Sequence, residues 1–173
     1  LPAQAYNYGE LYNLAIRRGT LSEEERFKIN EHIIQTIVML ENLPLPSNLK
    51  RVPEYAGTHH ETLLGTGYPR KLDKSQLSIP ARIMAIADIF EALTASDRPY
   101  KQAKTLSESI EILARLRDNG HIDADLFALF LHSEMPMRYA ERHLHPDQID
   151  AIDVARFVPT NQTVNQPAGT LSD

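Results

Sequence analysis

The sequence predicts an all-α protein, a bundle of about six helices around one hydrophobic core. Apolar residues recur every three or four positions along most of the chain, and capping boxes precede two of these stretches. No alternating strand pattern, hairpin turn or internal repeat competes with this pattern. The 173 residues, 42% of them hydrophobic and 24% charged, suit one compact domain.

The first helix is predicted to begin at the capping box of Ser22 and Glu25. Its apolar stripe then continues for about five turns through Ile29, Ile33, Ile37 and Leu40. The prolines in residues 43–46 end it, because proline cannot continue a helix. A second helix is predicted from Asn48 to about Glu61, with Pro53 weakening its first turns.

The helical pattern then stops over residues 63–78, where it is broken by Gly65, Gly67 and Pro69. An irregular loop of this length inside a compact domain is usually functional. A third helix is predicted from Pro80 to roughly Ala95. The capping box of Thr105 and Glu108 starts a fourth, which Gly120 ends.

Two short helical patterns follow, one at Leu126–Leu131 and one at Gln148–Ala155. Residues 159–173 are rich in Asn, Gln, Thr, Pro and Gly and predict a polar tail that builds no core. The expected domain therefore covers residues 1–158.

Charge and composition exclude several kinds of protein. Eighteen Lys and Arg against 23 Asp and Glu give a net charge of −5, which argues against a surface that coats DNA or RNA. Without cysteine there is no disulfide, thiolate metal site or cysteine nucleophile. No apolar run approaches the roughly 18 residues of a membrane span. Because the first residue is Leu and no signal peptide is visible, we expect a piece of a longer cytoplasmic protein.

The adjacent histidines His59 and His60 are the first candidate site. Neighbouring residues on a helix point about 100° apart, so two imidazoles there would serve different ions of a two-metal centre. The alternative is a chance pair on the surface.

Two further side chains can join them. His32 lies at the edge of the apolar stripe of the first helix and is expected to face inward, as a ligand or as a satisfied core residue. Asp88 lies within the third helix, among the small residues Ala81, Ala85, Ala92 and Ala95. A carboxylate in such a seam needs a metal, a donor network or a salt bridge. Imidazole and carboxylate together suit iron, manganese or zinc.

Other residues offer groups for a ligand. Gly65 and Gly67 allow a close backbone approach, and Tyr68 offers a stacking face and a hydroxyl. Arg98 and Lys101, on a turn stiffened by proline, suit a phosphate. A solvated surface turn is the alternative for this pair.

Three motifs follow one another along the chain: His59-His60-Glu61 with Gly65-Thr66-Gly67-Tyr68-Pro69, the helix around Asp88 to Glu91, and Arg98-Pro99-Tyr100-Lys101. Together they resemble the HD-GYP family, bacterial signalling phosphodiesterases that hydrolyse cyclic di-GMP. The stretch of residues 19–26, with His32 seven residues after Glu25, also resembles this family. The resemblance covers roughly residues 14–131.

The resemblance implies an all-helical domain of the HD type that holds two or three divalent metal ions, iron or manganese. The metal ligands it implies are His32, His59, His60 and Asp88. Arg98 and Lys101 would bind the phosphates of cyclic di-GMP, and Tyr68 would belong to the loop over the substrate. A water on the metals would open the cyclic dinucleotide. The partners it implies are signalling proteins at the GYP loop and a second copy of the chain.

Two features depart from the family. No His-Asp dipeptide occurs in the 173 residues, so we expect that pair upstream of Leu1, leave the general acid or base unassigned and expect partial or absent metal here. Leu64 stands where the family has Asp. The alternatives are a non-catalytic domain that senses the dinucleotide or binds partner proteins, and an enzyme for another nucleotide.

Overall fold

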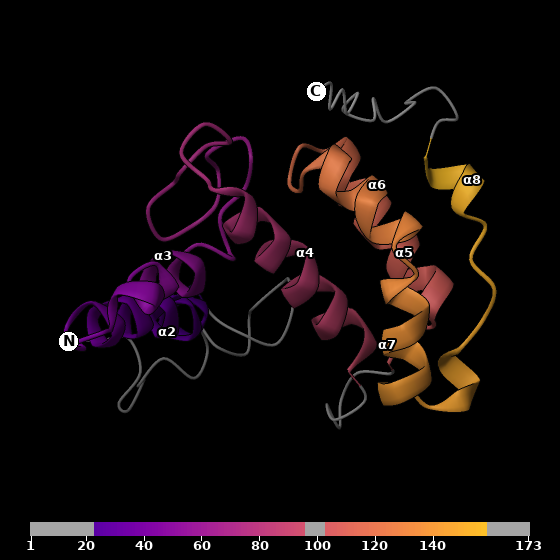
Figure 1. Ribbon diagram of the computed structural model, residues 1–173, viewed down its shortest axis with the longest axis horizontal. Helices are drawn as coiled ribbons and strands as arrows, with labels where there is room; N and C mark the ends of the chain where they lie inside the picture. Colours follow the sequence, from indigo (N-terminus) through magenta and orange to yellow (C-terminus); the bar gives the residue numbers. More distant parts are fainter. Residues whose placement is uncertain (1–22, 96–102, 159–173) are drawn as a thin grey trace, which may run out of the picture. The chain divides into compact units, whose positions relative to one another are not determined.

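The computed structural model describes residues 23–95 and 103–158. The chain divides into two units, the first ending at Gly57 and the second beginning at Thr58. Over these residues the secondary structure consists of seven α-helices, two 3₁₀ helices and an isolated bridge between Leu64 and Asp73 (Figure 1). The predicted all-α fold is therefore confirmed. None of the described helices is long and apolar enough to cross a membrane.

The first unit is built on α2 (Glu23–Glu41), which confirms the predicted first helix. Ile33 and Ile37 from its apolar stripe are buried, and α3 (Val52–Gly57) packs against it. A Cβ atom on Gly57 would lie only 2.6 Å from Cγ1 of Ile37, so glycine lets the end of α3 approach α2 closely. Ser22, half of the predicted capping box, lies outside the described residues.

The prediction of one helix from Asn48 to Glu61 is wrong in its extent. The chain forms the 3₁₀ helix η1 (Ser47–Leu49) and then α3, which ends at Gly57. His59 and His60 lie in a turn. The carbonyl of His60 accepts a hydrogen bond from the backbone N–H of Tyr68 at 3.3 Å, so the following loop takes the place of a further helical turn.

The second unit contains α4 (Ile79–Thr94), α5 (Leu106–Asp118) and α6 (Ala124–His132), close to their predicted bounds. Both hydrogen bonds of the Thr105–Glu108 capping box form at the start of α5. Gly120 follows α5 with φ of +66°, a left-handed conformation that glycine adopts without strain. These local signals therefore fix the helix ends as the sequence predicts.

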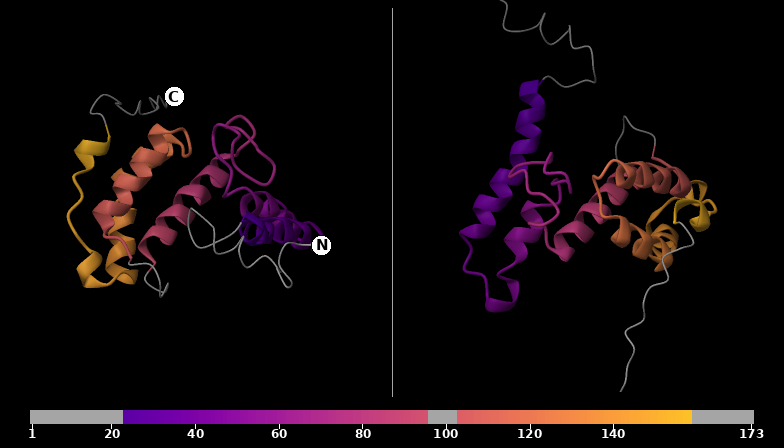
Figure 2. Two further views of the ribbon diagram at one scale, coloured as in Figure 1. Left: turned by 180° about the vertical axis from the view of Figure 1, so that it is seen from behind. Right: turned by 90° about the horizontal axis from the view of Figure 1, so that it is seen from above.

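The core of this unit lies between α4, α5, α6 and α7 (Met135–His143), and α8 (Val154–Phe157) packs against α6 (Figures 1 and 2). Its buried members are Ile86, Phe90, Leu106, Ile110, Leu113, Ala114, Ile122, Phe127, Leu131 and Ala140. They come from four helices and from the connection between α5 and α6, so one apolar cluster holds the unit together.

The C-terminal part differs from the sequence expectation. Helix α7 was not predicted, and the single pattern at 148–155 resolves into the 3₁₀ helix η2 (Pro146–Gln148) and the short α8. Gln148 is buried, and its side-chain amide donates to the backbone oxygens of Thr94, at 3.0 Å, and Lys104, at 2.9 Å. One side chain thus links the end of α4 to the segment before α5. The predicted tail, residues 159–173, lies outside the described residues.

Candidate metal and ligand site

His59 and His60 offer two imidazoles at one place in the second unit. Their ring centroids lie 4.3 Å apart with the planes tilted by 46°, and both residues are partly buried. One ligand nitrogen of each lies within 4.8 Å of the other. Because the pair occupies a turn rather than a helix, the geometric reason for assigning the two rings to different metal ions does not hold.

Tyr68 lies against this pair. Its ring stacks on the imidazole of His60 with centroids 4.8 Å apart and planes 24° from parallel. Gly67 makes this approach possible, because a Cβ there would lie 2.5 Å from Cα of Glu61 and 2.6 Å from the backbone oxygen of His60. Gly65 has φ of +69°. The glycines predicted to admit a ligand therefore also let the loop pack on its own chain.

Asp88 belongs to the same neighbourhood. It is partly buried on α4, as are Ala92 and Ala95, whereas Ala81 and Ala85 are fully buried. Burial raises the pKa of Tyr68, and the negative charge of Asp88 raises it further. No hydrogen bond or ion pair joins Asp88 to another residue of the described part of the chain. The role of Asp88 as a metal ligand stays a prediction.

The remaining candidates have different outcomes. His32 lies on α2, in the first unit, and its side chain is exposed, so its role as a metal ligand stays a prediction. Its position at the edge of the stripe, beside buried Ile33, explains the exposure. Arg98 and Lys101 lie outside the described residues, and their role stays a prediction.

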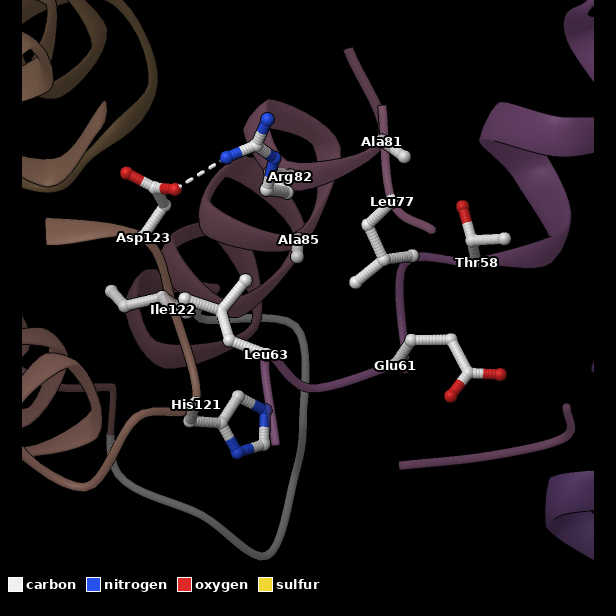
Figure 3. A pocket seen from close by; sticks show the side chains of 10 residues that line it. All are labelled: Thr58, Glu61, Leu63, Leu77, Ala81, Arg82, Ala85, His121, Ile122 and Asp123. Carbon is white, nitrogen blue, oxygen red and sulfur yellow. Dashed lines mark hydrogen bonds and ion pairs between the residues drawn. The ribbon is translucent and has the colours of Figure 1, made fainter. Parts of the chain in front are cut away.

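A small pocket opens beside the loop, between the loop, α4 and the start of α6 (Figure 3). Its lining includes Glu61, Arg82, His121 and Asp123. Burial lowers the pKa of His121, which favours a neutral imidazole there. Figure 3 shows the guanidinium of Arg82 pointing to Asp123, whereas the carboxylate of Glu61 points away from His121. The pocket therefore has a charged side at the start of α6.

Comparison with known families decides the membership of this chain. The HD domain family matches residues 1–126, which is most of the chain and includes both histidines, the loop and α4. The chain belongs to the HD domain family. Membership of this family implies divalent metal binding.

Its relatives identify the HD-GYP type. The chain is 36% identical over 115 residues to 3'3'-cGAMP-specific phosphodiesterase 1 of Vibrio cholerae, covering 66% of this chain and 26% of the relative. It is 44% identical over 73 residues to a cyclic di-GMP phosphodiesterase of Pseudomonas aeruginosa, covering 42% and 17%. It is 36% identical over 105 residues to one of Thermotoga maritima, covering 60% and 27%. The HD domain therefore spans about a quarter or less of the length of these relatives.

Two buried carboxylates of this HD domain were not singled out from the sequence. Asp123, 2% exposed, accepts from the backbone N–H groups of Asp125 and Leu126 at the start of α6 and pairs with Arg82 at 2.6 Å. An Asp directly before an apolar helical run is the signal of an N-cap and could have identified it. Glu61, 1% exposed, was noted only as part of the motif.

Leu64, which stands where the family has Asp, lies on the loop of this HD domain. Leu64 is 65% exposed and forms an isolated bridge with Asp73 across the loop. Its Cγ would lie 3.0 Å from a Cβ on Gly120, so Leu64 contacts the backbone after α5. Leu64 therefore adds apolar surface where an Asp would add charge.

Proposed function

We propose that this HD domain takes part in the metal-dependent hydrolysis of the phosphodiester bonds of cyclic di-GMP in bacterial signalling. The observation that carries the proposal is the pair His59–His60 with Tyr68 stacked on it, and with the charge of Asp88 acting on Tyr68. The relatives are named for the hydrolysis of cyclic di-GMP or 3'3'-cGAMP, which supports a cyclic dinucleotide as substrate. As part of the proposal, we expect the protein in the cytoplasm.

The donor groups suit the metals proposed. Neutral imidazole nitrogens and carboxylate oxygens bind iron and manganese, and we assign His32, His59, His60 and Asp88 as the ligands of two or three such ions. Divalent ions at this place would lower the pKa of a bound water and neutralise charge on phosphate oxygens. The half-buried position of His59, His60 and Asp88 limits competition from solvent.

The chain's own residues would hold the dinucleotide. Tyr68 stacks its aromatic ring on His60. An aromatic ring at this place also suits contact with a flat base or the edge of a ribose. Arg98 binds two phosphate oxygens at once, and Lys101 acts as a mobile point charge. Their assignment follows from the sequence motif.

Metal binding and hydrolysis test the proposal together. His60→Ala is expected to lower the iron or manganese content of the purified protein, whereas His143→Ala, in α7, is the matched control and leaves it unchanged. Occupancy in the unaltered protein falls below about pH 6, because ligand imidazoles must be neutral. In the complete protein, cyclic di-GMP and 3'3'-cGAMP are assayed in parallel. Full metal content and turnover in His60→Ala would contradict the site.

A non-catalytic role is the second candidate, favoured by two observations. No His-Asp dipeptide occurs in the sequence, and Leu64 exposes an apolar side chain on the loop. Such a domain would bind the dinucleotide, a signalling protein at the loop or a second copy of itself. Saturable binding of cyclic di-GMP without turnover in the metal-loaded complete protein would favour this candidate.

A further inference from the structure

Glu61 is a buried acidic group that is held by hydrogen bonds to the backbone of the loop. It is 1% exposed, and its two carboxylate oxygens accept from the backbone N–H groups of Arg70, at 2.7 Å, and Leu72, at 3.0 Å. Among the described residues no ion pair involves its carboxylate. A buried carboxylate is costly unless hydrogen bonds satisfy it, and such charge-assisted bonds are strong. The carboxylate therefore holds the loop tightly at two points.

These two bonds join opposite limbs of the loop. Glu61 directly follows His60, whereas Arg70 and Leu72 lie on the returning limb, just beyond Tyr68. Between them, the backbone N–H of Tyr68 donates to the His60 oxygen, and Gly67 lies against the backbone of residues 60–62. The position of Tyr68 over His60 is thus fixed from both sides.

We propose that Glu61 is a positioning residue, whose carboxylate holds the returning limb of the loop so that Tyr68 stays stacked on His60. The inference rests on the proposed function in that His60 and Tyr68 belong to the metal and ligand site. Glu61 itself touches neither ligand nor metal in this role and acts through its two backbone donors. A carboxylate that only stabilised the fold would not affect the stacking selectively.

Glu61→Gln is the variant that tests this role. It keeps one acceptor oxygen but places an NH₂ group against the second backbone N–H, so one bond is lost. The matched control is Asp150→Asn, because Asp150 likewise accepts from a backbone N–H and a second donor, those of Ser107, at the start of α5. Both variants remove one acceptor from a two-bond carboxylate, but only the first affects the loop.

Two spectroscopic readouts report on the loop directly. The first is hydrogen exchange of the Arg70 and Leu72 amides, which we expect to become about tenfold faster in Glu61→Gln and to stay unchanged in Asp150→Asn. The second is the ring-current shift of the His60 imidazole protons, with Tyr68→Leu as the reference without stacking. In Glu61→Gln this shift is expected to move toward that reference.

Kinetics on the metal-loaded complete protein add a third readout. The KM for cyclic di-GMP is expected to rise about tenfold in Glu61→Gln with a smaller change in kcat, because the loop orders the substrate. If the unaltered protein does not hydrolyse the dinucleotide, the proposed function fails, while the exchange and ring-current measurements still decide the role of Glu61.

The inference is overturned if exchange and the His60 shift stay as in the unaltered protein, or if Asp150→Asn changes them equally. Should Glu61→Gln fail to fold, Glu61→Asp keeps the charge but is one methylene shorter, and smaller changes in the same direction are expected. Unaltered exchange and stacking in that variant would also overturn it.

Discussion

The ion pair of Asp123 with Arg82 gives a quantitative prediction. Asp123→Asn keeps an N-cap acceptor for α6 but removes the charge, and leaves Arg82, whose side chain is 17% exposed, without its partner at 2.6 Å. A hydrogen bond to a charged group contributes about 1.5–3 kcal/mol, so the free energy of unfolding is expected to fall by about 2 kcal/mol. In a protein of this size that lowers Tm by roughly 4–8 °C.

The matched comparison is Lys74, which reaches the same carboxylate at 3.4 Å but is 57% exposed. Solvent screens such a pair, so Lys74→Ala is expected to change the unfolding free energy by less than about 1 kcal/mol. Asp123→Ala also removes the cap, which adds about 1 kcal/mol to the loss. Urea unfolding and calorimetry of the three variants measure these losses of unfolding free energy and so test their rank order.

The contribution of Asp123 to the free energy of unfolding depends on pH. Burial acts to raise the pKa of Asp123, but the hydrogen bond from the Leu126 backbone and the charges of Arg82 and Lys74 outweigh it, and the net pKa lies below its ordinary value. The stabilisation is therefore complete above about pH 4, the unfolded pKa, and disappears as pH falls through the lower folded value. The difference between the unaltered protein and Asp123→Asn should shrink in acid. A difference that is absent near neutral pH, or constant throughout, would refute the reasoning.

Three further predictions concern other parts of the molecule. Arg98→Ala should weaken cyclic di-GMP binding by about 2–3 kcal/mol, more than Lys101→Ala, with metal content and Tm unchanged; equal losses by calorimetric titration would contradict the bidentate role. Gly67→Ala should destabilise the protein by about 1–3 kcal/mol in urea unfolding, because its Cβ would collide with the backbone of Glu61; an unchanged midpoint would show that the loop can move away. Thr105→Ala should cost about 1 kcal/mol by the same measurement through loss of the capping box, and a cost near zero would mean that another group caps α5.

Local signals in the sequence were sufficient for most of the fold. The bounds of α4 and α5 follow from Pro80, the Thr105–Glu108 box and Gly120, each of which acts within one helical turn. Helix α7 was missed because Pro136 resembles a break, although at the start of a helix proline loses no hydrogen bond. Its core contact, Ala140, is one small residue in a polar stretch.

The site was harder to predict wherever it depends on tertiary contacts. Adjacent histidines were recognised, but their turn exists because the loop returns to the carbonyl of His60, a contact that no local pattern encodes. The same holds for Glu61, whose partners are backbone amides nine and eleven residues away. For Asp88 the sequence left a metal, a donor network and a salt bridge open, and within the described residues no hydrogen bond or ion pair reaches its carboxylate, so its role as a ligand stays a prediction. Backbone donors carry no sequence signature.

The amide of Gln148 has a consequence for where this protein can be divided. The family match ends at residue 126, inside α6. Gln148 lies twenty-two residues beyond that boundary, but its amide donates to the backbone oxygens of Thr94 and Lys104, which lie inside the matched segment. Phe127, Leu131 and Ala140, all beyond that boundary, belong to the same apolar cluster as Phe90. A fragment cut at the family boundary would leave the oxygens of Thr94 and Lys104 without their donor and the core open on one side. The segment that the family matches is thus shorter than the segment whose side chains pack into one core.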